Sequence, residues 1–323
     1  MKLQFSALNE QGKRENNEDN YYPQPDNNDS AKNLYMVCDG VGGADKGEVA
    51  SNIACSAIAE YFKRNKSDEV NDNFVQSAIM QAESGMRKYI ELNPDSRGMA
   101  TTLTLLYFDK DQAVVAHCGD SRVYQVRDGE ILHKTFDHSL VNELLASGAI
   151  KDEEAARNHP KKNVITRALS GGKEHTEADV TFLTDVKKDD FFLLCSDGIL
   201  ESVDDAKIKE LFVKENSAEF ICNEIKKLCD GHSKDNFTAI VVKTEQNLVA
   251  AKVPTTIVAT PEIVAAEQET PQAQAAEEES ADELIVIKEE VEENYEKKSN
   301  KPIKYLTLLG VLAILAFAGY KYG

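Results

Sequence analysis

Acidic residues at the ends of apolar, strand-like runs constrain this chain more than any other feature of its sequence. The set comprises Glu18, Asp19, Asp39, Asp120, Asp197 and Asp235. A carboxylate at the tip of a buried strand is held rigidly, and several carboxylates that meet in one cleft repel each other strongly. A hard cation relieves this repulsion, because Mg²⁺ and Mn²⁺ favour oxygen ligands. The pattern therefore predicts a metal-dependent hydrolase with a carboxylate-lined site.

Strand-like runs and amphipathic segments share residues 1–244 without regular alternation. Apolar residues recur at helical spacing over 47–64 and 72–92, which predicts two long helices laid on a sheet. Shorter helices are expected near 204–214 and 217–230, and strands over 3–8, 32–38, 101–108, 113–118, 122–133, 178–183, 190–195 and 237–243. Because these elements do not follow a βαβ order, they favour an α+β fold in layers over a doubly wound sheet.

Charge and cysteine content narrow the class of protein. The net charge is −19 and no basic stripe is available to meet phosphates, so we expect no nucleic-acid partner. The six cysteines form no CxxC pair, and Cys38, Cys118 and Cys195 each end an apolar run, so we expect buried, reduced thiols. The first residues hold no apolar stretch long enough for a signal peptide, which favours a cytoplasmic domain.

The composition changes after Thr244. Residues 245–303 are rich in Ala, Pro, Thr and Glu and poor in aromatic residues, which predicts an extended acidic linker. The apolar run that follows, with a lysine at each end, predicts a single transmembrane helix over 304–321 that anchors the chain in a membrane. More lysines precede this run than follow it, so we expect the catalytic domain on the cytoplasmic side.

Asp39 and Gly40 lie at the centre of the predicted chemistry. An Asp at a strand end can bridge two divalent ions with its two oxygens, and the glycine after it lets its own carbonyl ligate one of them. Asp197 and Asp235 would supply carboxylates to one ion.

Glu18, with Asp19 as a further candidate, would hold the second ion through water, since Mg²⁺ gives up its water reluctantly. Arg14 lies four residues before Glu18 and carries the planar fork that pairs with phosphate oxygens. Two ions about 4 Å apart lower the pKa of a bridging water and clamp an in-line displacement at phosphorus. The set therefore predicts hydrolysis of a phosphate ester without a protein nucleophile.

Short motifs in a fixed order carry a family resemblance. They are Arg14 with Glu18 and Asp19, and the segments DGVGG at 39–43, GMATT at 98–102, GDSRVY at 119–124, DHS at 137–139, ITRAL at 165–169, CSDG at 195–198 and DNFT at 235–238. Over about residues 5–243 the chain resembles the metal-dependent Ser/Thr protein phosphatases, also called the PPM or protein phosphatase 2C family, and most of all their bacterial branch.

The resemblance implies a four-layer α-β-β-α sandwich over residues 1–244, in which two antiparallel sheets are flanked by helices. The stretch 139–170 matches a flap beside the cleft. The implied roles are Asp39 as bridging ligand, the Gly40 carbonyl, Asp197 and Asp235 as direct ligands, Glu18 as a ligand through water, and Arg14 as phosphate clamp. Asp120, with Asp197, would hold a third and looser ion, so two or three Mn²⁺ or Mg²⁺ are expected.

The general acid stays open at the level of sequence. Animal members of the family carry His directly after the Asp-Gly pair, where this chain has Val41. His138 and His159 fit flap-supporting roles better than acid catalysis. Protonation of the leaving group therefore falls to a metal-bound water or to a residue that the sequence does not identify.

Together these features favour a membrane-anchored phosphatase that hydrolyses phosphoserine and phosphothreonine in proteins and opposes a bacterial Ser/Thr kinase. The alternative is a catalytically inactive scaffold that binds phosphoproteins; it predicts a broken metal set, whereas the set is intact. A nuclease or nucleotide hydrolase is disfavoured by the acidic charge and by the lack of Trp in the chain.

Overall fold

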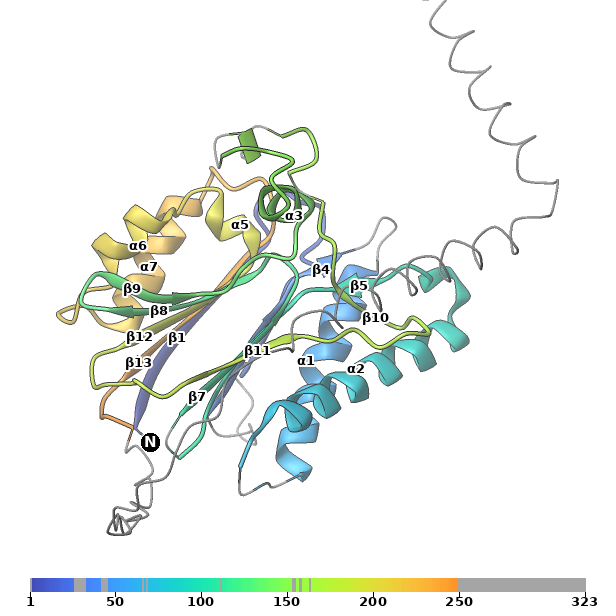
Figure 1. The fold of residues 1–323 in the computed structure, drawn as a ribbon, viewed down its shortest axis with the longest axis horizontal. Helices are drawn as coiled ribbons and strands as arrows, with labels where there is room; N and C mark the ends of the chain where they lie inside the picture. Colours follow the sequence, from blue (N-terminus) through green and yellow to red (C-terminus); the bar gives the residue numbers. More distant parts are fainter. Residues whose placement is uncertain are drawn as a thin grey trace, which may run out of the picture. The chain divides into compact units, whose positions relative to one another are not determined.

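Two antiparallel sheets form the centre of the fold (Figure 1). The computed structural model describes residues 2–25, 33–41, 46–65, 67, 69–110, 112–152, 155–156, 159–162 and 164–248. One sheet has the strand order β1 (Leu3–Glu10), β13 (Phe237–Thr244), β12 (Phe191–Cys195), β8 (Arg122–Arg127) and β9 (Glu130–Lys134). The other has the order β11 (Asp179–Leu183), β7 (Ala113–Cys118), β6 (Leu103–Phe108), β3 (Leu34–Cys38) and β2 (Asn20–Tyr22).

Helices cover the outer face of each sheet (Figure 1). α1 (Gly47–Arg64) and α2 (Asp72–Leu92) pack on the sheet that contains β3, whereas α6 (Asp205–Leu211) and α7 (Ala218–Cys229) pack on the sheet that contains β12. Side-chain caps fix where helices begin: Asn71 accepts from the Phe74 N–H before α2, and Ser217 accepts from the Phe220 N–H before α7. The described residues thus form an α+β fold whose layers run helix, sheet, sheet, helix.

Alternating side chains along the central strands produce this layering. In β12, Phe191, Leu193 and Cys195 face the helices, while Phe192 and Leu194 belong to the core between the two sheets. Successive side chains of a strand point to opposite faces, so a strand covered on both faces is apolar throughout. Every residue of β12 and of β3 is accordingly buried.

A short third sheet joins the predicted flap to the end of the sandwich. Its order is β10 (Leu169–Ser170), β5 (Ala100–Thr101) and β4 (Gly40–Val41). Within the predicted flap, the described residues form α3 (Leu140–Ala146), which Ser139 caps by accepting from the Asn142 N–H. Ser139 also pairs with Ile165, so the two ends of the flap meet. The remaining described elements are η1 (Pro94–Ser96) and α5 (Asp197–Leu200).

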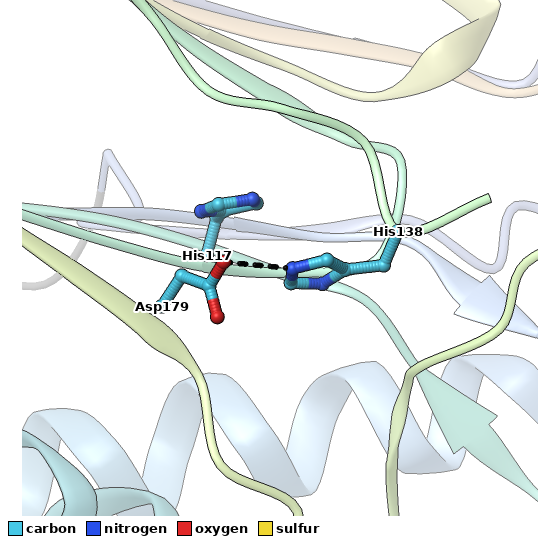
Figure 2. A group of neighbouring side chains, drawn as sticks. All are labelled: His117, His138 and Asp179. Carbon is cyan, nitrogen blue, oxygen red and sulfur yellow. Dashed lines mark hydrogen bonds and ion pairs between the residues drawn. The ribbon is translucent and has the colours of Figure 1, made fainter. Parts of the chain in front are cut away.

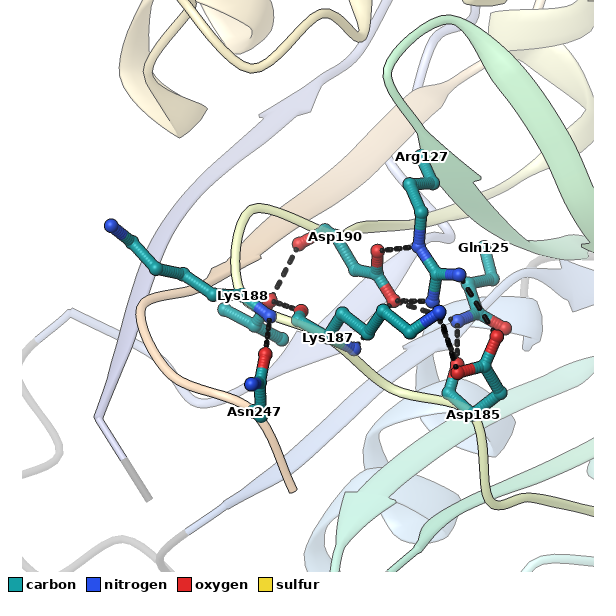
Figure 3. A network of polar contacts seen from close by, with 8 residues as sticks. Gln125, Arg127, Asp185, Lys187, Lys188, Asp190 and Asn247 are labelled. Atoms are coloured by element: carbon teal, nitrogen blue, oxygen red, sulfur yellow. Dashed lines mark hydrogen bonds and ion pairs between the residues drawn. The ribbon is translucent and has the colours of Figure 1, made fainter. Parts of the chain in front are cut away.

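A buried carboxylate closes the end of the sandwich at which β8 finishes and β12 begins (Figure 3). Asp190, whose side chain is fully buried, accepts two hydrogen bonds from the Arg127 guanidinium, at 2.6 and 2.8 Å. It also accepts from Gln125 Nε2 and from the backbone N–H of Lys187. A buried charge must be paired and hydrogen-bonded in this way. This network fixes one end of the strands whose opposite ends carry the acidic residues.

The predicted architecture with a C-terminal transmembrane helix needs correction. Among the described residues, no helix is both long and apolar enough to cross a membrane. The two longest, α1 and α2, bury one face on the sheet and leave polar residues on the other. The predicted anchor over 304–321 lies outside the described residues, which form an α+β sandwich with no membrane-spanning helix among them.

The first residues of the predicted linker still contact the sandwich. The Glu245 N–H donates to the Lys2 carbonyl, and the Leu248 N–H donates to the Val186 carbonyl. Leu248 packs against the core between the sheets. The rest of the predicted linker, 249–303, lies outside the described residues.

Candidate active site

Strand pairing brings the predicted ligands to one end of both sheets. The end of β12 pairs with the start of β8 and with the first residues of β13. Asp197, Asp120 and Asp235 therefore lie at neighbouring strand ends. In the other sheet the end of β3 pairs with the start of β2, which places Asp39 near Asp19. Asp39 interacts electrostatically with all four of these other carboxylates. Segments from the whole length of the domain therefore build one acidic site.

Two threonines hold Asp39 by its backbone: Thr101, the last residue of β5, and Thr102, which follows it. The Asp39 N–H donates to Thr102 Oγ1 at 3.0 Å, and the Thr102 N–H donates to the Asp39 carbonyl at 2.8 Å. The Thr101 hydroxyl donates to the same carbonyl at 2.9 Å. Both threonines are buried. With its backbone fixed on both sides, the Asp39 side chain is presented from a rigid support.

Asp19 is more deeply buried than the other predicted carboxylate ligands. Its Oδ2 accepts from the Ser196 hydroxyl at 2.7 Å, whereas its Oδ1 is buried and makes no hydrogen bond among the described residues. Burial first, and the charges of Asp197 and Asp235 second, raise the pKa of Asp19 to about 7. Since Ser196 directly precedes Asp197, this bond ties two of the acidic segments together.

The backbone at Gly40 is tightly packed against two other segments. The Gly40 N–H donates to the Glu18 carbonyl at 3.2 Å. A Cβ on Gly40 would lie 2.3 Å from the Gly47 carbonyl group and 2.6 Å from the Glu18 carbonyl oxygen, so no side chain fits here. The Glu18 carbonyl also accepts from the Ser51 hydroxyl at 2.7 Å. The start of α1 therefore holds both Glu18 and Gly40 in place.

Arg14 forms an ion pair with a predicted metal ligand. Its Nη2 lies 2.5 Å from Asp235 Oδ2, and its side chain is 57% exposed. This ion pair raises the pKa of Arg14 further above its usual range. Next to Asp235, the Asn236 side chain accepts from the Glu18 N–H and donates to the Gln11 carbonyl. The loop that carries Arg14 and Glu18 is thus fastened to the start of β13.

The acidic site favours protons or cations over bare negative charge. Burial and the surrounding carboxylates raise the pKa of Asp39 well above its usual range. For the same two reasons, in the same order, the pKa of Asp120 rises to about 7 and that of Asp197 to about 6. Asp197 Oδ1, like Asp19 Oδ1, is buried without a hydrogen-bond partner among the described residues. Such an arrangement fits a divalent cation, which supplies the missing partner to oxygen donors.

Sequence reasoning proposed the acidic residues as ligands but did not point to the side chains that hold their segments. Ser196 and Asn236 are sequence neighbours of the predicted ligands Asp197 and Asp235, which was the available signal for them. Thr102 lies in the motif GMATT, which contains no predicted ligand. No signal pointed to a second group, in which possible ligand atoms of His117, His138 and Asp179 all lie within 4.8 Å of one another (Figure 2). No three of the predicted carboxylates meet that closely among the described residues.

Comparison with known proteins assigns the class. The chain belongs to the protein phosphatase 2C family, whose sequence profile matches residues 10–222. It therefore carries a Ser/Thr protein phosphatase domain of the 2C type. It is 35% identical over 220 residues to the serine/threonine phosphatase stp of Listeria innocua, covering 67% of this chain and 85% of the relative. It is 33% identical over 243 residues to the serine/threonine protein phosphatase PstP of Mycobacterium tuberculosis, covering 74% of this chain. The match spans 44% of the length of that relative.

Solved structures of relatives share the fold. The crystal structure of the Mycobacterium tuberculosis phosphatase PstP/Ppp has a TM-score of 0.67 and 32% identity, and the match covers 76% of this chain and 99% of that one. The catalytic domain of PstP in complex with two manganese ions has a TM-score of 0.63 and 30% identity, with 76% and 99% covered. Phosphatases of this family use Mn²⁺ or Mg²⁺, in accord with the carboxylate chemistry of the site.

Proposed function

We propose that this protein hydrolyses phosphoserine and phosphothreonine in other proteins by a metal-dependent mechanism. The observation that carries the proposal is the meeting of Asp19, Asp39, Asp120, Asp197 and Asp235 at one end of the sandwich, where the pKa values of the first four are raised and a buried oxygen each of Asp19 and Asp197 lacks a partner among the described residues. The family relationship supports the same activity.

Each predicted ligand keeps its proposed role. Asp39 would bridge two ions, Asp197 and Asp235 would bind directly, the Gly40 carbonyl and Glu18 (through water) would complete the set, Asp19 would support it, and Asp120 with Asp197 would hold a third ion. When bound, two or three Mn²⁺ or Mg²⁺ supply Lewis acidity, which lowers the pKa of water and neutralises charge on the phosphoryl group.

The residues of the chain orient the substrate and keep the site rigid. The exposed guanidinium of Arg14 presents a planar fork that matches two phosphate oxygens, and Asp235 holds that fork at the rim of the site. Thr101 and Thr102 keep the Asp39 backbone fixed, so the carboxylate does not drift between turnovers. Positioning of this kind supplies a large part of the catalysis in phosphoryl transfer.

A Ser/Thr protein kinase is the proposed source of the substrate, because that class of reaction produces phosphoserine and phosphothreonine. We place the reaction in the cytoplasm, where protein thiols stay reduced. All six cysteines are free and buried, in keeping with that compartment.

An inactive phosphoprotein-binding scaffold remains the alternative, and one experiment separates the two. The purified full-length chain is mixed with phosphothreonine, phosphoserine and phosphotyrosine peptides in Mn²⁺ and in excess EDTA. The proposal predicts phosphate release from the first two peptides in Mn²⁺ only, and its loss in Asp39→Asn. Binding of phosphopeptide by a folded chain without turnover in any divalent ion would favour the scaffold.

A further inference from the structure

One carboxylate of the rigid sheet contacts residues at both ends of the predicted flap. Asp179, on β11, accepts through Oδ2 from His138 Nε2 at 3.1 Å (Figure 2), and through Oδ1 from Arg167 Nη1 at 2.6 Å. His138 directly precedes the flap and Arg167 lies near its end. The His138 carbonyl also accepts from the Thr166 N–H at 2.9 Å. The base of the flap is thus closed around His138.

His138 reaches from this closure to the acidic site. The ring Nδ1 of His138 accepts from the Gly119 N–H at 3.1 Å, and the backbone N–H of His138 donates to the Gly119 carbonyl at 2.8 Å. Gly119 directly precedes Asp120, one of the proposed metal ligands. The residue after His138, Ser139, caps α3 of the flap. A single buried side chain therefore connects the flap to the loop that carries Asp120.

The connection continues from Gly119 to Asp39. Gly119 has φ +107°, and a Cβ added to it would lie 2.6 Å from Thr102 Cγ2, so the loop is pressed against Thr102. Thr102 accepts the Asp39 N–H, and its hydroxyl lies 2.8 Å from that of Ser121. A shift of Gly119 would therefore disturb the support of Asp39 as well as the position of Asp120.

The hydrogen bonds also decide against a metal site at this histidine group. Because His138 Nδ1 accepts a backbone N–H, the neutral ring carries its proton on Nε2 and donates it to Asp179. A ring in that tautomer has no lone pair free for a cation. His117, whose ring stacks on His138 with centroids 4.6 Å apart, donates its Nε2 proton to the Phe136 carbonyl at 2.8 Å. His117, His138 and Asp179 therefore form a cluster held by hydrogen bonds and ring stacking.

We propose that His138 is a positioning residue of the phosphatase reaction, which holds the Gly119–Asp120 segment in register with the flap, while Asp179 and Arg167 hold His138. The role of Asp120 rests on the proposed function. The bond to Gly119 is the one on which activity depends, since it acts next to the ligand. Replacing a residue that orients a metal ligand without touching the metal typically lowers metal affinity or activity by about 10–100-fold.

The test compares two replacements that each keep half of the imidazole. Asn carries an amide oxygen at the position of Nδ1, so His138→Asn can still accept from Gly119, whereas the longer His138→Gln reaches Asp179 but not Gly119. Two readouts are taken on the full-length chain: the rate of phosphothreonine-peptide hydrolysis in Mn²⁺, and the hydrogen exchange of the Gly119 amide without metal. His175→Asn is the control, because that histidine bonds Glu83 of α2 instead.

We expect His138→Gln to lower kcat by about 10–100-fold and to accelerate exchange at Gly119. His138→Asn should keep both within a few-fold of the wild type, as should the control. Equal losses in Asn and Gln, or an unchanged kcat in Gln, would overturn the proposal. If the wild type shows no turnover, the proposed function fails by itself, and the exchange measurement still decides whether His138 holds Gly119.

Discussion

Nη2 of Arg14 lies 2.5 Å from Oδ2 of Asp235, across 221 positions of sequence. The contact joins the proposed phosphate clamp to a proposed metal ligand. Because the pair is partly exposed, its worth to stability is small. Its consequence is orientation: the guanidinium is held at the rim of the acidic site, where an incoming phosphate would meet it.

Arg14→Lys should therefore impair catalysis although it keeps the charge. An ammonium cannot form two parallel bonds to a phosphate. Loss of one charged hydrogen bond is worth about 1.5–3 kcal/mol, so kcat/KM should fall by about 10-fold or more. Steady-state kinetics on a phosphothreonine peptide measures this. Arg64→Lys, at an exposed pair with Glu60, should leave kcat/KM unchanged, and an equal loss in both variants would contradict the assignment.

The stability of the metal-free chain should fall as the pH rises from about 4 to about 7 through the acidic site. The pKa values of Asp19 and Asp120 rise from 3.8 to about 7 on folding, so in this range the folded state holds protons that the unfolded state has released. Stability then decreases with pH and is lowest once both groups are ionised. The Tm in EDTA, measured for the wild type and for Asp120→Asn, isolates this contribution from other titrating groups.

Between pH 5 and pH 8 in EDTA, the Tm of Asp120→Asn should increase relative to the Tm of the wild type. Saturating Mn²⁺ should reverse the order at pH 8, since a cation stabilises the charged carboxylate. A difference that stays constant across pH in EDTA would show that Asp120 does not carry the raised pKa.

Gly40→Ala should damage the site through a steric clash. The new methyl group would lie 2.3 Å from the Gly47 backbone, which cannot yield as a flexible side chain does. Overpacking of this kind costs about 1–3 kcal/mol in unfolding free energy, and the displaced backbone should weaken Mn²⁺ binding. Chemical denaturation and calorimetric titration measure the two effects. Gly172→Ala, where the nearest non-adjacent atom is the Ser170 hydroxyl at 3.3 Å, is the matched control.

Asp190→Ala should destabilise the fold without a direct effect on the chemistry. It would leave Arg127 and Gln125 without their buried acceptor, at a cost of about 3 kcal/mol, the lower end for a broken buried pair, because Arg127 is 25% exposed. Urea denaturation measures the loss. Glu130→Gln, which breaks an exposed pair with Lys209, should cost no more than about 1 kcal/mol. Equal losses of unfolding free energy in the two variants would mean that burial of Asp190 does not determine its contribution to stability.

Sequence patterns were most informative where a segment is buried along one regular face. The helical spacing over 47–64 and 72–92 predicted α1 and α2 with the boundaries they have, because each buries one apolar stripe. The predicted strand over 122–133 divides into β8 and β9 at Asp128 and Gly129, both with positive φ, which an Asp-Gly pair adopts readily in a turn.

Sequence patterns were least informative where contacts join distant polar residues. α3 has only Val141 buried, so its apolar periodicity was too weak to predict a helix within the flap. The bond between His138 and Asp179 spans 41 positions and follows from strand order, which no local spacing encodes. The acidic residues could be proposed as ligands because each ends or begins an apolar run, whereas the hydroxyl and amide groups that support them have no such sequence pattern.

The most direct test of the account is anomalous X-ray scattering from a Mn²⁺-soaked crystal of the full-length protein. We expect two manganese peaks that share Asp39, one of them also bound by Asp197 and Asp235. No peak should lie between His117, His138 and Asp179. Absence of manganese at Asp39 in a crystal that binds it elsewhere would contradict the central claim that these carboxylates form the metal site.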